Sequence, residues 1–364
     1  MTPERCERAL ITACPLCRSE GATKLYRTGD ALYGGADVFD VVRCKACGLV
    51  YVEDPPSDAA LPSFYPHDSY YAYKPPVPYS LFESRALPAQ LWYPIKRSVL
   101  AWDFGYKHLR GHRSLAVCLH LPFLHWLRQR ATFQLNVLLP RYVKDGTLLD
   151  IGCGSGMYLA LMKALGWKRV VGVDINQEAL KRARQVLDIE VHCGSLPTLK
   201  LAAGSFDAVT LSHTLEHVGD PVALLTEIHR LLKPGGQLAI VVPNIDSVSS
   251  RAYGVDWFAL DVPRHLVSFN RRTLAAAVTQ TGFTVESLGS SPQSTYLLAL
   301  LSLNRRARIP HSDRVEPRFP ATFHARAALI SLRAWVACGL GRTAGEELLL
   351  SAVKPLSEMA KSPA

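Results

Sequence analysis

Residues 147–156 read Thr-Leu-Leu-Asp-Ile-Gly-Cys-Gly-Ser-Gly, and this stretch decides the fold that we expect. The apolar run 148–151 predicts a buried strand, and the apolar-periodic segment 158–165 predicts a helix soon after the three glycines. A strand that turns through glycines into a helix leaves free backbone N–H groups at the helix start. Glycine, which has no Cβ atom, lets a ligand approach the backbone closely. Taken alone, however, the three glycines also fit an ordinary tight turn.

A second strand supplies a carboxylate beside these glycines. Residues 168–176, Lys-Arg-Val-Val-Gly-Val-Asp-Ile-Asn, predict a buried strand that ends at Asp174. In a right-handed βαβ unit, this carboxylate lies next to the glycine turn of the preceding strand. It can accept hydrogen bonds from both hydroxyls of a ribose. We therefore expect a nucleoside ligand, with its sugar on Asp174 and its other end over the glycines.

The spacing of the glycines separates two kinds of nucleoside cofactor. Dinucleotides favour Gly-x-Gly-x-x-Gly, whereas this chain has Gly-x-Gly-x-Gly preceded by Asp150. That pattern resembles motif I of the class I S-adenosylmethionine-dependent methyltransferases. Three further blocks resemble the same family in order and spacing: Gly-Val-Asp-Ile-Asn at 172–176, Ser-Phe-Asp-Ala-Val-Thr-Leu-Ser-His-Thr-Leu-Glu-His-Val at 205–218, and Leu-Leu-Lys-Pro-Gly-Gly-Gln-Leu-Ala-Ile-Val-Val-Pro-Asn at 231–244. The resemblance covers about residues 135–290.

The resemblance implies which residues contact S-adenosylmethionine. Asp150 is expected near the methionine part of the cofactor, and Asp174 at the ribose. Residues 193–197 resemble the loop beside the adenine, although Ser195 stands where many members have aspartate, which puts the usual adenine contact in doubt. The expected cofactor-binding residues are Asp150, Gly152, Cys153, Gly154, Gly156, Asp174, Ile175, Ser195, Leu196, Ser212 and His213.

Strands and helices alternate along this part of the chain, which favours a mainly parallel sheet with helices on both faces. We therefore expect an α/β fold: a Rossmann-like, seven-stranded methyltransferase sheet with a small N-terminal zinc-binding unit and helical cap insertions. Strands are predicted near 147–151, 169–174, 189–192, 206–211, 236–242, 283–288 and 347–353. Helices are predicted near 156–165, 176–187, 220–232 and 271–281.

Composition sets wider limits. A chain of 364 residues is long enough for roughly two or three units. The formal net charge of +10 favours acidic partners such as nucleotide-linked substrates, phospholipid surfaces or nucleic acid. The sequence has no uncharged apolar run of about 18 residues, so we expect no spanning helix. Residues 1–8 lack the apolar region of a signal peptide, which favours a cytoplasmic protein.

The cysteines indicate a metal site. In a reducing compartment, nine cysteines favour metal binding over disulfides. Cys14-Pro-Leu-Cys17 and Cys44-Lys-Ala-Cys47 are two Cys-x-x-Cys knuckles, which together can complete a tetrahedral four-cysteine zinc site. Such a site leaves no open position, so we expect structural zinc, with an iron–sulfur cluster as the minor alternative. Some bacterial sugar and natural-product methyltransferases carry a similar unit before motif I.

We divide the chain into four parts. Residues 1–53 form the four-cysteine zinc-binding unit, 54–80 a linker rich in proline and tyrosine, and 81–139 an apolar and basic helical cap. The S-adenosylmethionine-binding methyltransferase domain takes 140–355, with an insertion at 289–346 that is also apolar and basic. Both insertions can hold an acidic substrate, contact a membrane surface peripherally, or simply cover the sheet. Four linker tyrosines can line the mouth of the substrate site or serve as packing: Tyr65, Tyr70, Tyr71 and Tyr73.

Two segments carry the candidate catalytic residues. Glu216 and His217 follow the fourth strand, at the ligand edge of the sheet, where they can orient a substrate or take its proton. The segment Trp257 to Leu266 contains Pro-Arg-His-Leu and resembles a signature of bacterial methyltransferases of cell-surface glycan and natural-product pathways. There, Arg264 can pair with a phosphate or carboxylate, and His265 suits a general base. Histidines satisfied by nearby backbone are the alternative.

These patterns predict methyl transfer from S-adenosylmethionine to a small-molecule acceptor. A sugar or a glycan or natural-product intermediate is favoured, methylated on oxygen or carbon, with His217 or His265 as the base. One alternative is a nucleic-acid methyltransferase, but the Asn-Pro-Pro-Tyr type of motif is missing and nucleic acid is not the partner we expect. Another alternative is a non-catalytic nucleoside-binding regulatory module.

Overall fold

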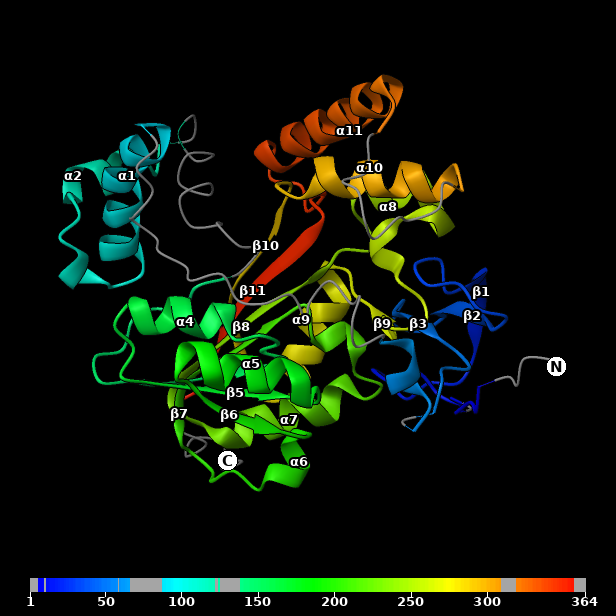
Figure 1. The fold of residues 1–364 in the computed structure, drawn as a ribbon, viewed down its shortest axis with the longest axis horizontal. Helices are drawn as coiled ribbons and strands as arrows, with labels where there is room; N and C mark the ends of the chain where they lie inside the picture. Colours follow the sequence, from blue (N-terminus) through cyan, green and yellow to red (C-terminus); the bar gives the residue numbers. More distant parts are fainter. Residues whose placement is uncertain are drawn as a thin grey trace, which may run out of the picture.

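A computed structural model describes residues 6–9, 11–57, 59–65, 87–121, 124, 138–308 and 319–356 (Figure 1). These residues form a central seven-stranded sheet and a four-stranded sheet that contains the N-terminal strands. Several parts of the predicted linker and first cap lie outside the described residues, among them Tyr70, Tyr71 and Tyr73.

The central sheet has the strand order β10-β11-β8-β7-β4-β5-β6. Five strands are parallel: β4 (Thr147–Ile151), β5 (Arg169–Asp174), β6 (Glu190–Cys193), β7 (Phe206–Ser212) and β8 (Leu232–Pro243). β11 (Glu347–Val353) is antiparallel to both β8 and β10 (Thr284–Ser291). The order reverses at β4, between β5 and β7, so the ligand crevice of such a sheet lies beside the end of β4. This Rossmann-like sheet confirms the predicted fold.

Helices cover both faces of the sheet (Figure 1). One face packs against α4 (Met157–Ala164) and α5 (Gln177–Leu187), and the other against α7 (Pro221–Leu231) and α9 (Arg271–Gln280). The starts of these helices are encoded locally: Asn176 caps α5, Asp220 caps α7, and Asn270 forms a capping box with Thr273 at the start of α9. The short helix α6 (Leu196–Leu199) follows β6.

The four-stranded sheet joins the N-terminal unit to the main domain. β1 (Ala22–Gly29), β2 (Val38–Cys44) and β3 (Val50–Val52) are consecutive, but the fourth strand is β9 (Val267–Ser268), from the segment before α9. The backbone N–H of Val52 also donates to the Leu266 carbonyl at 2.9 Å. β9 was not predicted, because its two residues are too few to show a strand pattern.

The segment between β8 and α9 contains α8 (Val248–Tyr253) and two 3-10 turns, η6 (Gly254–Asp256) and η7 (Phe258–Leu260). The first insertion contributes α1 (Leu87–Asp103), η3 (Lys107–Leu109) and α2 (Arg113–Cys118). The second contributes α10 (Thr295–Arg306) and α11 (Ala321–Gly339), which pack on each other beyond the β10–β11 edge (Figure 1). None of the helices in the described parts of the chain has the length and hydropathy to span a bilayer.

Candidate active site

The glycine loop follows β4 at the switch point of the sheet. Gly152 has a φ of 74°, and a Cβ atom at this position would lie 2.2 Å from the Thr214 hydroxyl oxygen. Gly156, with a φ of 81°, occupies the N-cap position of α4. Both angles are in the left-handed region that a side chain makes costly. The loop therefore needs glycine both for its backbone path and for the space beside Thr214.

Asp174 holds this loop in shape. Its Oδ2 atom accepts the Gly154 N–H at 2.8 Å, and its Oδ1 atom accepts the Asn176 N–H at 2.8 Å. Burial raises the pKa of Asp174, while these backbone N–H groups act in the opposite direction. The carboxylate retains lone pairs for a ribose. Next to it, Ile175 is 63% exposed, which provides an apolar surface where a nucleoside base can pack.

Asp150 lies deeper under the loop. It is 3% exposed and accepts a hydrogen bond from the Thr210 hydroxyl at 2.7 Å. Burial raises the pKa of Asp150 to about 7, which the Thr210 hydrogen bond opposes and the charge of Asp174 reinforces. A buried carboxylate of this kind suits a cationic group such as the ammonium of S-adenosylmethionine. Its position fits the predicted contact with the methionine part.

The other predicted cofactor residues surround the same edge. Ser195 is exposed before α6, with its hydroxyl 3.4 Å from that of Thr198, and Leu196 is buried. The Cys153 side chain is also buried; a Cβ atom on Gly172 would lie 2.6 Å from its sulfur. Cys153 therefore packs under the loop, so that only its backbone can serve a ligand.

A cluster of polar side chains follows β7 at the same edge. His213 has a φ of 53°, an uncommon conformation outside glycine, and its Nδ1 atom lies 3.4 Å from Glu216 Oε1. Burial acts to lower the pKa of His213, but Glu216 and Glu347 raise it above its ordinary value. Conversely, burial acts to raise the pKa of Glu216, but His213 and His217 lower it. These shifts favour an imidazolium–carboxylate pair at His213 and Glu216.

His217 and His265, the two histidines predicted as candidate bases for the acceptor, lie next to each other. Their ring centroids are 4.6 Å apart. His217, in the turn η5 (Leu215–His217), has its Nδ1 atom 3.0 Å from the Arg264 carbonyl and 2.9 Å from the Tyr65 hydroxyl. Burial and the neighbouring His265 lower the pKa of His217 to about 4, so this imidazole is neutral near pH 7.

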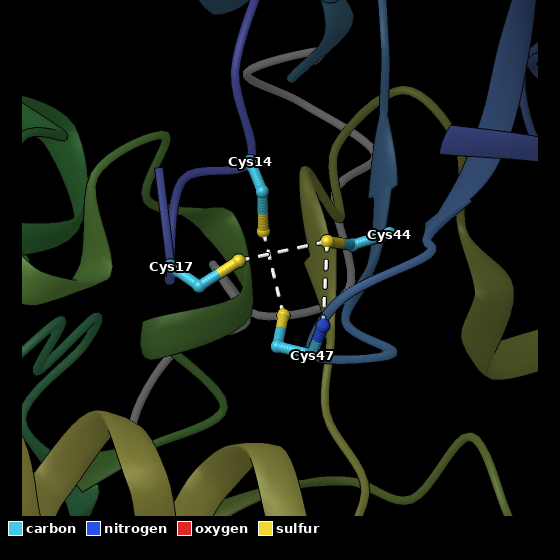
Figure 2. A group of neighbouring side chains, drawn as sticks. All are labelled: Cys14, Cys17, Cys44 and Cys47. Atoms are coloured by element: carbon cyan, nitrogen blue, oxygen red, sulfur yellow. Dashed lines mark hydrogen bonds between the residues drawn. The ribbon is translucent and has the colours of Figure 1, made fainter. Parts of the chain in front are cut away.

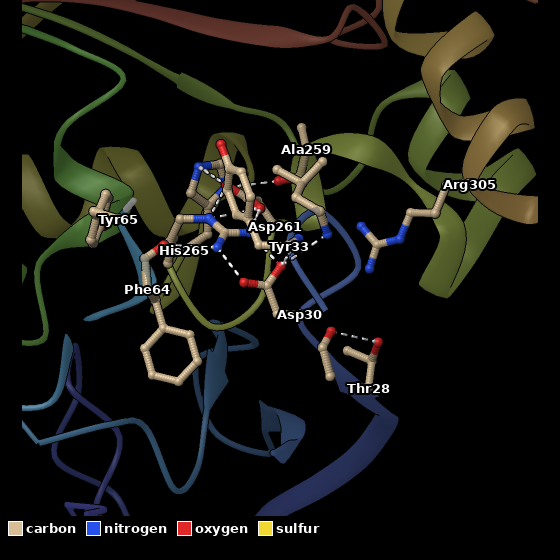
Figure 3. A network of polar contacts seen from close by, with 12 residues as sticks. Thr28, Asp30, Tyr33, Phe64, Tyr65, Ala259, Asp261, His265 and Arg305 are labelled. Atoms are coloured by element: carbon tan, nitrogen blue, oxygen red, sulfur yellow. Dashed lines mark hydrogen bonds and ion pairs between the residues drawn. The ribbon is translucent and has the colours of Figure 1, made fainter. Parts of the chain in front are cut away.

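Arg264 does not serve a substrate, and the prediction that it pairs with a phosphate or carboxylate of the substrate is wrong. Its side chain is fully buried and binds Asp30 and Asp261, which Figure 3 shows close together beside His265. One of its N–H groups also donates to the Phe64 carbonyl at 3.1 Å. Asp30 precedes Arg264 by 234 residues, so no local pattern could have shown this partner.

The four predicted metal ligands converge in the N-terminal unit (Figure 2). The sulfur atoms of Cys14 and Cys47 are 3.6 Å apart, as are those of Cys17 and Cys44. The backbone N–H groups of Cys47 and Leu49 lie 3.5 Å from the sulfurs of Cys44 and Cys47, respectively, and so can stabilise thiolates. Four converging sulfurs with such support fit a tetrahedral zinc ion.

The sheet order, the glycine loop after β4 and the carboxylate at the end of β5 define a nucleoside-binding domain of the methyltransferase type. Residues 123–288 match the family model described as a methyltransferase domain. Residues 123–288 therefore form a methyltransferase domain, as the motifs predicted.

Two curated relatives each match about a third of the chain. The chain is 34% identical over 128 residues to the ubiquinone biosynthesis O-methyltransferase of Parvibaculum lavamentivorans, covering 33% of this chain and 50% of that protein. It is 38% identical over 122 residues to an uncharacterized 37.1 kDa protein of a Streptomyces fradiae transposon, covering 32% of this chain and 34% of that protein. The chain thus spans half or less of the length of these relatives.

Solved structures resemble the chain more distantly. An S-adenosylmethionine-dependent methyltransferase from Mesorhizobium loti has a TM-score of 0.40 at 20% identity, over 63% of this chain and 97% of that chain. One from Archaeoglobus fulgidus has a TM-score of 0.40 at 20% identity, over 70% of this chain and 98% of that chain.

Proposed function

We propose that the protein transfers a methyl group from S-adenosylmethionine to a small-molecule acceptor. The observation that carries this proposal is that the glycine loop and the cluster of polar side chains after β7 lie at the same edge of the sheet. The glycine loop with Asp174 suits the adenosyl part, and the cluster after β7 lies where an acceptor would meet the methyl group. The sulfonium of the cofactor supplies the methyl group together with its own leaving group.

The protein's own residues align the acceptor and handle its proton. The pKa of about 4 keeps His217 neutral, so it can take a proton from an acceptor hydroxyl or from a carbon beside a carbonyl. His265 is the alternative base, and the carboxylate of Glu216 lies close to both imidazoles. The Tyr65 hydroxyl, 2.9 Å from His217 Nδ1, brings the linker after the N-terminal unit to this site.

We propose a sugar or a glycan or natural-product intermediate as the acceptor, methylated on oxygen or carbon. The Pro-Arg-His-Leu segment supports this class through its resemblance to enzymes of such pathways. The names of some curated relatives support a small organic acceptor more generally, since they describe O-methyltransferases of ubiquinone biosynthesis.

We propose structural zinc at the four cysteines and a cytoplasmic location, where thiolates remain reduced. We further propose that the second insertion contacts anionic membrane surfaces. Four apolar side chains of α11 and the residue after it recur at helical spacing and are half-exposed or more: Leu329, Leu332, Val336 and Leu340. Residues 319–344 contain no aspartate or glutamate but several arginines, which suits a negatively charged interface.

Calorimetry and turnover test the function separately. The zinc-loaded protein should bind S-adenosylhomocysteine, and Asp174→Ala should lose at least about tenfold in affinity, because the ribose and the loop both depend on this carboxylate. Glycan intermediates incubated with labelled cofactor should then identify the acceptor. Wild-type protein that binds a nicotinamide dinucleotide but neither S-adenosylmethionine nor its demethylated product would contradict the proposal.

A further inference from the structure

Glu216 has an unusual environment for a carboxylate. Its side chain is 1% exposed, and among the described residues neither carboxylate oxygen has a hydrogen-bond partner. His213 Nδ1, at 3.4 Å from Oε1, is close without the geometry of a hydrogen bond. Burying a charged group without donors is costly unless a cation compensates it. The nearby imidazolium of His213 supplies charge but no hydrogen bond, so both carboxylate oxygens still have lone pairs for a positive ligand.

The two neighbouring histidines each have one nitrogen fixed by backbone. His265 Nδ1 lies 2.8 Å from the Ala259 carbonyl, and His217 Nδ1 lies 3.0 Å from the Arg264 carbonyl. Since a carbonyl oxygen only accepts, both Nδ1 atoms carry a proton, and in a neutral imidazole the lone pair is then on Nε2. Metal-binding histidines show this arrangement, in which one ring N–H donates to a carbonyl and the other nitrogen binds the ion.

We propose that Glu216, His217 and His265 together bind one divalent transition-metal cation. A ring nitrogen from each histidine and a carboxylate oxygen lie within 4.8 Å of one another, which is close enough for one ion to gather all three. Two imidazoles and one carboxylate are the ligand set of catalytic zinc sites and of non-haem iron sites, and both leave coordination positions open. His217 is only partly buried, which gives access from its side.

This inference rests on the proposed function and changes the role of His217 and His265 in it. With a cation bound, their lone pairs coordinate it and no longer take the acceptor proton. An acceptor hydroxyl or enolisable carbonyl can fill an open position on the cation, which lowers the pKa of that group. The proton then leaves to water. The acceptor's electron pair forms the new bond to the methyl group, while the sulfonium sulfur keeps the electron pair of the broken bond.

Cobalt(II) is a suitable probe, because its spectrum distinguishes the two candidate metal sites. The full chain is first loaded with one equivalent of zinc to fill the four cysteines, and cobalt is then titrated in. Binding at the proposed site should give visible d–d bands without the thiolate-to-cobalt charge-transfer bands of cysteine ligation. Appearance of only charge-transfer bands, or no cobalt uptake, would overturn the inference.

Variants locate the ion. Glu216→Gln and His265→Gln should each weaken cobalt binding by at least about tenfold, as loss of a ligand does. His192→Gln is the matched control: His192 also lies 3.0 Å from a glutamate, Glu190, but on β6, the edge strand of the sheet. Each variant is also titrated with S-adenosylhomocysteine, which shows that the domain is folded.

The two proposals fail in different ways. If wild-type protein binds S-adenosylhomocysteine but takes up no cobalt outside the cysteines, this inference fails and the histidines remain free as bases. If it binds cobalt at the cluster but not the nucleoside, the proposed methyl transfer fails. Cobalt binding that persists unchanged in both Glu216→Gln and His265→Gln places the ion elsewhere and also overturns the inference.

Discussion

The buried Arg264, which binds Asp30 and Asp261, allows a quantitative prediction. Arg264→Met keeps most of the side-chain volume but leaves Asp30 and Asp261 without their partner, and the side chains of these two aspartates are only 3% and 4% exposed. Removing one member of a buried, hydrogen-bonded ion pair costs about 3–5 kcal/mol. We therefore expect the free energy of unfolding to fall by this amount in denaturant titrations followed by fluorescence.

Two further variants make this prediction specific. Arg169→Met removes an exposed arginine paired with Glu190 and should cost no more than about 1 kcal/mol. Adding Asp30→Asn to Arg264→Met should recover part of the stability, because the substitution removes one of the two stranded charges. An Arg264→Met protein that unfolds within about 1 kcal/mol of wild type would refute the reasoning, since the ion pair would then contribute no more than a surface pair.

Three further perturbations test the cofactor loop, the buried acid and the proposed membrane surface. Gly152→Ala should lower cofactor affinity at least about tenfold in calorimetry, because the new Cβ meets Thr214 at a positive φ. The folded protein holds the pKa of Asp150 at about 7, whereas in the unfolded chain this carboxyl loses its proton near its ordinary pKa of about 4. The free energy of unfolding therefore decreases as the pH rises from about 4 to 7. Asp150→Asn should therefore flatten the decline of melting temperature over that range while weakening cofactor binding; an unchanged slope would contradict the shift. Leu332→Glu with Val336→Glu should abolish co-sedimentation with anionic vesicles but leave cofactor affinity intact, and equal binding to neutral vesicles would argue against the proposed charge complementarity.

The parts of the fold that the sequence could predict are those whose determinants are close together along the chain. The glycines after β4 and the acid that ends β5 belong to short strand–turn segments, and each segment prescribes its own geometry. The parallel order then brings Asp174 to the loop without further information. The cysteine knuckles were predictable for the same reason, because their ligand spacing is local.

The parts that could not be predicted depend on pairing between distant segments. The sequence analysis allowed Arg264 a substrate partner because an arginine in a loop looks available, whereas its partner Asp30 follows β1, 234 positions earlier in the chain. Tyr65 reaches His217 across 152 positions, which neither residue's neighbours reveal. Likewise, Cys153 stands in the cofactor loop, but the tight packing beside Gly172 turns its side chain inward.

The short strand β9 has a consequence for dissecting this protein. Val267 and Ser268 complete a sheet whose other strands all precede residue 53. The loop that contains His265 therefore gains its last backbone partners only after the amino-terminal portion, residues 1–53, has docked. A shortened polypeptide that starts after that portion would expose an open strand edge and would leave the Arg264 guanidinium with only one of its two carboxylate partners. Such a fragment should self-associate rather than work as a minimal transferase.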